Sequence, residues 1–267
     1  MERKKTTLTT ILKLYETGER ITMLTAYDFP SGVIADQAGV DTILIGDSLG
    51  AVVNGYPNTL PVTVEEIIYH TKAVVRAARY AFIVADMPFL SYQTGVRDAI
   101  YNAGRLLKEG GAEAVKLEGG RNVRDIIKAI VNVDIPVMGH IGLTPQSLHR
   151  MGGYRVQGKD KKSYDALIED ARAVEDAGAF AVVLEGIPGA LAKEITSKMH
   201  IPTIGIGAGK DTSGQVLVFH DLLGLSERQP TFVKQYAQLK TTAIQAVQHY
   251  ISEVKQGVFP GQEHTYK

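Results

Sequence analysis

Short apolar runs alternate with longer amphipathic segments along almost the whole chain. The runs are rich in Val and Ile and have the length of strands that are covered on both faces, as in a parallel sheet. Between them, apolar residues recur at the helical spacing of three and four positions; in the segment 62–79 they are Ile67, Ile68, Val74 and Val75. The apolar runs span residues 21–28, 42–47, 81–87, 112–118, 135–142, 179–186, 201–207 and 215–221.

Eight strand–helix units in a chain of 267 residues favour the (β/α)8 TIM barrel, an α/β fold. A doubly wound open sheet is the alternative, but it would usually need fewer strands. A helix is expected at about residues 7–17, where it would close the bottom of the barrel. The segment 231–257 is an amphipathic C-terminal extension, expected to pack outside the barrel or against another subunit. No linker interrupts the pattern, so we expect one domain over residues 1–267.

Charged residues stand at the ends of most of the apolar runs, although such runs are expected to be buried. In a barrel, the C-terminal ends of the strands carry the active site. Side chains alternate along a strand, so Lys116 and Glu118 point to the same side. The pattern therefore predicts one charged rim made by Asp28, Asp47, Asp86, Lys116, Glu118, His140, Glu185 and Asp221.

Each of these residues also has an ordinary structural explanation. Asp28 and Asp221 are expected to cap the next helix, and Glu185 could also lie near a helix start. The two charged residues of the fourth run could form a buried ion pair, which is weak support for any function. His140 alone would more often be a hydrogen-bonded interior histidine. Only their joint occurrence on one rim favours a functional site.

Carboxylates without any cysteine suggest a hard cation, typically Mg²⁺ held by one or two carboxylates, waters and the substrate. Such an ion, chelated by an α-keto acid, would polarise the carbonyl and stabilise an enolate. Lys116 could bind the substrate carboxylate or the developing oxyanion, and Glu185 could move the proton. The residues thus predict a metal-assisted enolisation but do not indicate the electrophile.

Composition narrows the classes of partner. The chain has 29 Lys and Arg against 29 Asp and Glu, which argues against nucleic acid. No apolar run approaches the roughly 20 residues of a membrane span, and the first residues lack the continuous apolar stretch of a signal peptide. The absence of cysteine excludes disulfides and thiolate ligands, and cytoplasm is the default location.

A glycine-rich stretch, IPTIGIGAGKDTSGQ, includes the seventh run and the residues after it. Such a turn can hold phosphate in barrels, but this one lacks the spacing of a dinucleotide fingerprint or a P-loop. We favour the simpler explanation, that the glycines of 205–209 permit a tight turn.

A set of motifs in order then points to a family. LTAYD, GDSLG, TLPVTVEE, ADMPF, VKLEGG, GHIGLTPQS, GGYRVQG, LEGIP, IPTIGIGAG and GQVLVFHD, with the ending GVFPGQEHTY, together resemble ketopantoate hydroxymethyltransferase. The resemblance runs from near Thr6 to the C-terminus. It implies that 3-methyl-2-oxobutanoate and 5,10-methylenetetrahydrofolate give 2-dehydropantoate, an early step toward pantothenate and coenzyme A.

The resemblance also implies roles for individual residues. Asp47 and Asp86 would bind one Mg²⁺ per subunit, with Glu118 in the metal's surroundings. The keto acid would contact Asp47, Ser48, Asp86 and Lys116, with His140 lining the pocket. Glu185 would be the proton acceptor. Family members are cytoplasmic, and their usual assembly is a homodecamer.

Two other functions are weighed against this one. Another Mg²⁺-dependent keto-acid barrel, such as a lyase of the phosphoenolpyruvate mutase type, would share the metal carboxylates but typically offers a Cys or another acid in a mobile loop; this chain has no Cys. A non-catalytic barrel scaffold would be expected to have lost at least one of the implied site residues, and none is lost.

Overall fold

The computed structural model describes residues 3–227 and 229–267. The chain forms two compact units, Met1–Val218 and Phe219–Lys267. That residues 1–267 act as one catalytic domain stays a prediction.

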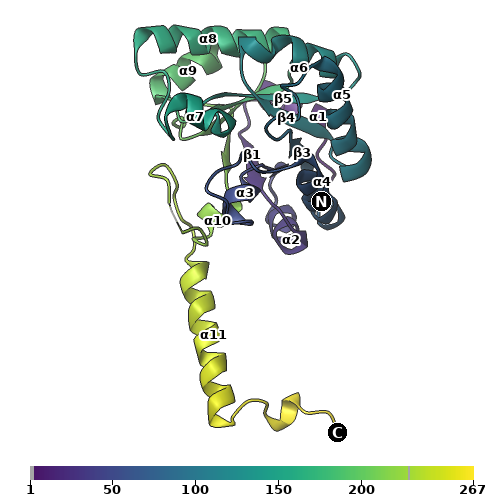
Figure 1. Cartoon of the computed structure of the whole chain (residues 1–267), viewed down its shortest axis with the longest axis vertical. Helices are drawn as coiled ribbons and strands as arrows, with labels where there is room; N and C mark the ends of the chain where they lie inside the picture. The colour runs from purple at the N-terminus through teal and green to yellow at the C-terminus, as the bar shows by residue number, and fades with distance from the viewer. Residues whose placement is uncertain (1–2, 228) are drawn as a thin grey trace. The chain divides into compact units, whose positions relative to one another are not determined.

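The first unit contains a closed barrel of eight parallel strands, in which each strand pairs with the next and the last pairs with the first (Figure 1). The predicted barrel is therefore confirmed, and the open sheet is excluded. The strands are β1 (Ile21–Thr25), β2 (Thr42–Ile45), β3 (Phe82–Asp86), β4 (Ala114–Glu118), β5 (Val137–Gly142), β6 (Ala181–Glu185), β7 (Thr203–Ile206) and β8 (Gly214–Leu217).

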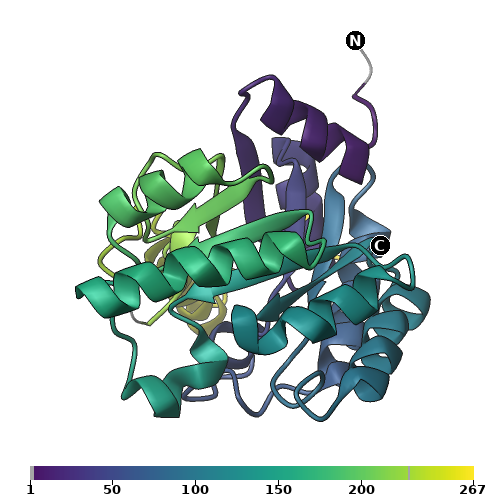
Figure 2. The same cartoon turned by 90° about the horizontal axis from the view of Figure 1, so that it is seen from above.

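Helices follow most of the strands, as the amphipathic segments predict (Figure 2). They are α1 (Leu8–Glu16), α2 (Phe29–Ala38), α3 (Leu49–Val52), α4 (Val64–Ala77), α5 (Val96–Arg105), α6 (Arg124–Val131), α7 (Leu148–Met151), α8 (Lys161–Asp176) and α9 (Gly189–Lys198). Short π or 3₁₀ turns occupy Leu106–Gly110, Arg121–Val123 and Pro145–Ser147. The local sequence fixes where α4 begins, because Thr63 and Glu66 form a reciprocal capping box.

The predicted N-terminal helix is α1, which closes one end of the barrel. Ile11 belongs to the same buried cluster as the inward side chains of the strands, and Leu8, Leu14 and Tyr15 pack against that cluster. The Tyr15 hydroxyl also donates a hydrogen bond of 2.9 Å to the carbonyl of Met199. The apolar stripe of α1 thus seals the barrel interior from water.

Asp36, in the last turn of α2, anchors the segment that leads into β3. Its carboxylate accepts the backbone N–H groups of Arg79, Tyr80 and Ala81 at 2.8–2.9 Å. Burial raises the pKa of Asp36, but these three donors outweigh that effect and hold the pKa below its usual value. The start of the strand that carries Asp86 is therefore fixed by one carboxylate.

We expect Asp36→Ala to lower the free energy of unfolding by about 3 kcal/mol, because it leaves three backbone N–H groups without their acceptor. A folded-state pKa below the unfolded value means that the stabilisation is present at neutral pH and is lost as pH falls through the folded-state pKa. Urea unfolding at neutral and acidic pH measures both effects. The control is Asp125→Ala, at an exposed position of α6, for which we expect less than about 1 kcal/mol; an equal loss in both variants would contradict the anchoring role.

The second unit begins with α10 (Phe219–Leu222) and continues to α11 (Leu239–Gln256), drawn in yellow in Figure 1. The eighth apolar run was predicted to be a strand as far as Asp221, and this is wrong: β8 ends at Leu217. The apolar Phe219 is buried as part of a helix. Periodicity alone cannot distinguish such a short buried helix from a strand.

Each of the described residues of α11 is at least partly exposed. The large apolar ones among them are Leu239, Ile244, Val247, Tyr250, Ile251 and Val254. Among the described residues, no helix has the length and hydropathy needed to span a membrane.

Candidate active site

The charged strand ends lie one layer above the apolar core of the barrel. Val84, Ala114, Met138 and Val183 belong to the buried cluster inside the barrel. Side chains two positions apart on a strand share a face, so the residues two positions further along also point inward. These residues are Asp86, Lys116, His140 and Glu185, and Glu118 stands two positions beyond Lys116.

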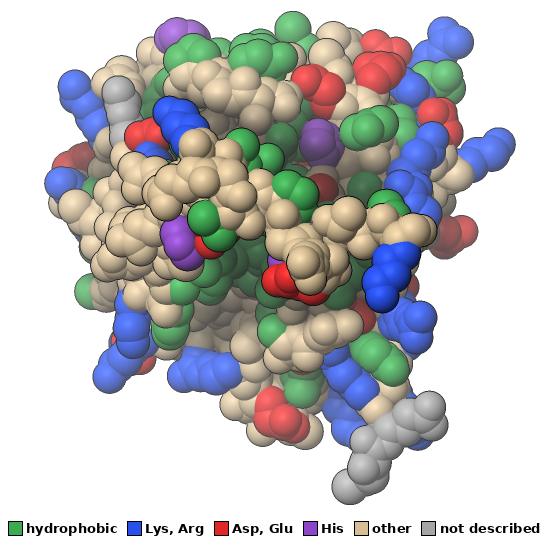
Figure 3. All heavy atoms as spheres, turned by 90° about the horizontal axis from the view of Figure 1, so that it is seen from below, with side chains coloured by type: hydrophobic (Ala, Val, Ile, Leu, Met, Phe, Trp, Pro, Cys, Tyr) green, Lys and Arg blue, Asp and Glu red, His purple; other side chains and the backbone are tan. Residues whose placement is uncertain are grey.

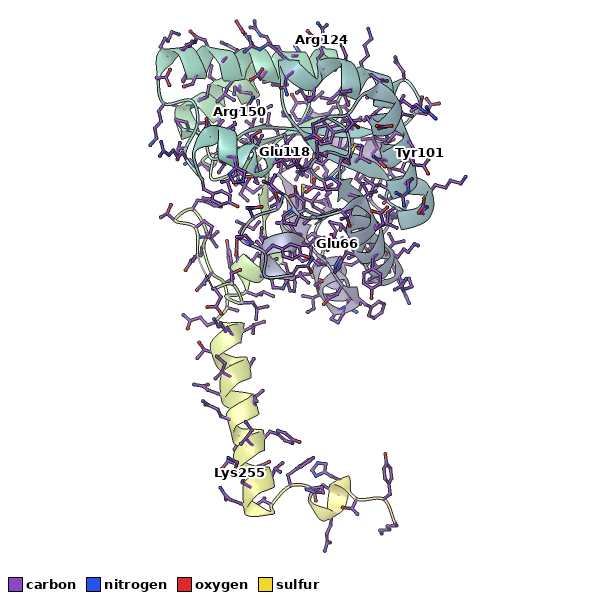
Figure 4. All side chains as sticks on the ribbon, viewed as in Figure 1. Glu66, Tyr101, Glu118, Arg124, Arg150 and Lys255 are labelled. Atoms are coloured by element: carbon purple, nitrogen blue, oxygen red, sulfur yellow. The ribbon has the colours of Figure 1, made fainter. Side chains whose placement is uncertain are left out.

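Strand register sets these residues beside one another. Asp86 pairs with Lys116 across β3 and β4, and Glu118 pairs with His140 across β4 and β5. Glu185 ends β6, the next strand around the barrel. Glu118 accordingly lies inside the barrel unit in Figure 4, whereas Arg124 and Tyr101 lie on its outer helices. Consecutive strands thus bring five of the predicted residues to one end of the barrel.

Asp47 joins this layer from the turn after β2. Its backbone N–H donates a hydrogen bond of 2.9 Å to Asp86 Oδ2. A Cβ atom at Gly46 would lie 3.4 Å from that oxygen and 2.7 Å from Ser48 Oγ, so the glycine permits this close approach. Burial raises the pKa of Asp47 well above its usual value, and the charges of Asp86 and Glu118 raise it further.

Lys116 is a buried cation among carboxylates. Its Nζ lies 2.7 Å from Asp86 Oδ1, and both side chains are about 95% buried, with exposures of 5% and 4%. Burial lowers the pKa of Lys116, but Asp86, Glu118 and Asp47 outweigh it and raise the pKa above its usual value. Lys116 is therefore charged at neutral pH.

His140 bridges the carboxylates of Glu118 and Glu185. Nδ1 lies 3.5 Å from Glu118 Oε1, and Nε2 lies 3.2 Å from Glu185 Oε2. Burial and Lys116 lower the pKa of His140, but the carboxylates of Glu118 and Glu185 raise it to about 9. Nδ1 also lies within hydrogen-bonding distance of Lys116 Nζ, at 3.3 Å, whereas Nε2 contacts Glu185 as an ion pair without a well-directed hydrogen bond.

Glu185 is the most solvent-accessible carboxylate of the layer. Its side chain is 17% exposed, compared with 2% for Glu118 and 4% for Asp86. A base that must reach a substrate needs such access. Only one of the two carboxylate oxygens of Glu185, Oε2, is in the contact with His140.

Two polar residues that the sequence analysis did not single out contact this layer. The Gln146 side chain donates to Asp47 Oδ2 at 2.8 Å, and its backbone N–H donates to Glu118 Oε2 at 3.0 Å. The Tyr92 hydroxyl accepts the backbone N–H of Glu118 at 3.1 Å. Gln146 stands within the motif GHIGLTPQS, but a neutral residue in a loop carries no periodic signal that marks it.

Two residues of the predicted rim remain, Asp28 and Asp221, and only the first caps a helix. Asp28 caps α2, accepting the backbone N–H of Ser31 at 2.8 Å, as expected. Asp221 was also expected to be a cap, and this is wrong: it lies within α10 and accepts a hydrogen bond from Ser226. Ser48 lies beside the layer, with its Oγ 2.8 Å from the Tyr27 hydroxyl.

The glycine-rich stretch after β7 has the geometry of a tight turn. Gly207 and Gly209 have positive φ angles of 59° and 77°, which glycine adopts without strain. The side chain of Gln215 donates to the Gly209 carbonyl at 2.9 Å and holds the turn closed.

The charged layer fits a divalent cation bound by two carboxylates. Four carboxyl groups lie beside only two basic side chains, Lys116 and His140, and the charges of neighbouring carboxylates add to burial in raising the pKa of Asp47. Within the described residues, no group of three His, Cys, Asp or Glu side chains is placed to hold one metal ion. Mg²⁺ does not need such a group, since one or two carboxylates with water and substrate suffice. Asp47 and Asp86 would supply such a pair.

The face of the molecule in Figure 3 carries side chains of both charges. On the face in Figure 3, Lys and Arg atoms and Asp and Glu atoms both occur around the rim. This mixture agrees with the net charge of zero.

Solved structures with the same fold are distant in sequence. A phosphonopyruvate hydrolase in complex with oxalate and Mg²⁺ superposes with a TM-score of 0.63 at 14% identity, over 97% of this chain and 93% of that one. A 2,3-dimethylmalate lyase of the PEP mutase/isocitrate lyase superfamily gives 0.62 at 17% identity, over 97% and 91%. These similarities support the barrel fold alone.

Sequence relatives are far closer. The 3-methyl-2-oxobutanoate hydroxymethyltransferase of Geobacter metallireducens is 61% identical over 267 residues and the full length of both chains. The enzyme of the same name from Moorella thermoacetica is 59% identical, over 100% of this chain and 99% of that one. The family model for ketopantoate hydroxymethyltransferase matches residues 5–262. The chain therefore belongs to the ketopantoate hydroxymethyltransferase family.

Proposed function

We propose that this chain transfers a hydroxymethyl group from 5,10-methylenetetrahydrofolate to 3-methyl-2-oxobutanoate and so forms 2-dehydropantoate, on the route to pantothenate and coenzyme A. Membership of the family supports this reaction. The observation that carries the proposal is the charged layer, in which an accessible carboxylate, Glu185, shares a barrel end with the buried Asp47 and Asp86.

Asp47 and Asp86 are the residues proposed to hold one Mg²⁺, with Glu118 in its surroundings. Bound there, the ion would polarise the carbonyl of the keto acid and favour its enolate. The contact of Lys116 with Asp86 keeps a permanent positive charge beside that position. Lys116 is thereby suited to bind the keto-acid carboxylate or the developing oxyanion, and Ser48 would provide a hydroxyl to the same substrate.

Glu185 is proposed to accept the proton from C3 of the keto acid. His140 is placed to orient it, because Nε2 lies 3.2 Å from Glu185 Oε2. The positive charge of His140 also offsets the repulsion between the Glu185 carboxylate and the negatively charged keto acid. The carbanion generated at C3 then forms a bond to the one-carbon unit of the folate, water supplies the hydroxyl oxygen, and both C–N bonds of the methylene bridge break so that tetrahydrofolate leaves.

Proton NMR of 3-methyl-2-oxobutanoate in D₂O tests this proposal. We expect loss of the C3 proton signal with the protein and Mg²⁺, but not when the metal is removed with EDTA. A hydroxymethyl product should form only after 5,10-methylenetetrahydrofolate is added. Folded protein that gives neither exchange nor product would reject the proposed function.

The assembly and location are proposed from the family. A homodecamer is supported by the exposed apolar side chains of α11, such as Val247 and Ile251, which a second copy could cover. Light scattering should then give about ten times the chain mass of 29.0 kDa, and a monomer mass would refute the decamer. We place the enzyme in the cytoplasm.

A further inference from the structure

The side-chain amide of Gln146 uses every hydrogen-bonding position it has. Nε2 donates to Asp47 Oδ2 at 2.8 Å and to the Met87 carbonyl at 3.0 Å. Oε1 accepts from the Tyr92 hydroxyl at 2.8 Å and from Gln93 Nε2 at 3.3 Å. An amide offers two donors and two strong acceptor positions, so this group has no freedom to turn.

The partners also determine which way the amide faces. The Met87 carbonyl can only accept a hydrogen bond, so the nitrogen of Gln146 must point to it and to Asp47. A flipped amide would set its oxygen against two acceptors. The hydroxyl of Tyr92, a residue that is 1% exposed, lies 2.8 Å from Oε1 at the opposite end of the amide and 3.0 Å from its other acceptor, the Glu118 carbonyl. The donor is thus aimed at Asp47 before any ligand binds.

The backbone of the same residue holds a second carboxylate. Gln146 is the second residue of the 3₁₀ turn Pro145–Ser147, where a backbone N–H has no partner within the turn. This N–H donates to Glu118 Oε2 at 3.0 Å. Asp47 and Glu118, which come from β2 and β4, are therefore connected through one residue of the loop after β5.

We infer that Gln146 is a positioning residue that fixes the carboxylates of Asp47 and Glu118 relative to each other for a divalent cation and its keto-acid ligand. The inference rests on the proposed function, to which it adds a residue that acts through Asp47 and Glu118. Glutamine suits the position because it donates without adding a further negative charge to a layer that already carries four carboxylates.

Gln146→Met keeps the length of the side chain and the backbone N–H but removes the donor to Asp47. We expect the dissociation constant for Mg²⁺ alone, measured by isothermal titration calorimetry, to rise about 10- to 100-fold, as for other residues that orient metal ligands. Saturating Mg²⁺ should restore kcat to within about threefold, because the reacting groups are unchanged. The control is Gln37→Met, the same change at an exposed position of α2, which should behave as wild type.

Tyr92→Phe provides a milder variant in case Gln146→Met does not fold. It leaves Gln146 in place but removes the hydroxyl that contacts both Gln146 Oε1 and the backbone of Glu118, so Mg²⁺ affinity should fall in the same direction by a smaller factor. If Tyr92 acts through Gln146, the double variant should bind Mg²⁺ no more weakly than Gln146→Met alone.

A metal-free crystal structure of either variant gives an independent readout: the Asp47 carboxylate should be displaced or should occupy more than one conformation. Unchanged Mg²⁺ affinity in a folded variant, or lost kcat that saturating Mg²⁺ does not restore, would overturn the inference. Wild-type protein that binds Mg²⁺ but forms no product would refute the proposed transfer reaction and leave the comparison of variants valid. Wild-type protein that binds no Mg²⁺ would overturn the inference itself.

Discussion

Glu185→Gln is expected to bind Mg²⁺ and 3-methyl-2-oxobutanoate nearly as well as wild type, while its turnover falls by about 10²- to 10⁴-fold. The amide keeps the shape of the side chain, and its oxygen can keep the close contact with His140 Nε2. It cannot accept the C3 proton of the keto acid, because an amide is not a base at neutral pH.

Steady-state rates and calorimetric titrations of this variant separate catalysis from binding. Glu169→Gln, the same change on the exposed face of α8, is the matched control and should retain wild-type kinetics. Near-normal kcat in Glu185→Gln would assign the proton transfer to another group. A parallel loss of binding and turnover would instead indicate that Glu185 shapes the site.

The second large effect is expected at Asp86. Asp86→Ala should abolish the binding of Mg²⁺ and of the keto acid together, because it removes one of the two proposed ligands. It should also lower the free energy of unfolding by about 3–5 kcal/mol, since Lys116 would remain buried and charged without the carboxylate 2.7 Å away. Mg²⁺ titration and urea unfolding measure the two losses.

Two further variants separate the loss of Mg²⁺ binding in Asp86→Ala from its loss of stability. Asp86→Asn retains an oxygen for the backbone N–H of Asp47 but removes the charge. The double variant Asp86→Asn/Lys116→Met removes both members of the ion pair and should recover most of the stability, yet still fail to bind Mg²⁺. Wild-type metal affinity in Asp86→Asn would remove Asp86 from the metal site.

The barrel and its charged layer were predictable because each depends on local sequence pattern. Strand length, apolar runs and helical spacing identify the eight units. A side-chain period of two positions then places Asp86 above Val84 and Glu185 above Val183 once the strands are assigned. No three-dimensional information is needed for these steps, since each compares residues within one strand.

The contacts of Gln146 and the structure around Asp221 could not be obtained in this way. Gln146 meets Asp47 across 99 positions of sequence, and only the closed barrel brings their loops together. Its neutral side chain gave no reason to expect a role there. Asp221 was misassigned because the apolar run continues through Phe219 into a helix of the second unit, where hydrophobicity reports burial and not strand geometry.

The stacking of a charged layer on an apolar layer also bears on how such a barrel changes over evolutionary time. The side chains that determine the barrel's shape, such as Val84 and Met138, are different from the side chains that meet a substrate. Mutations at the strand ends can therefore alter the chemistry while the shape persists. A lineage of such barrels can acquire new reactions by exchanging a few side chains, while the layer beneath them remains under selection only for volume and hydrophobicity.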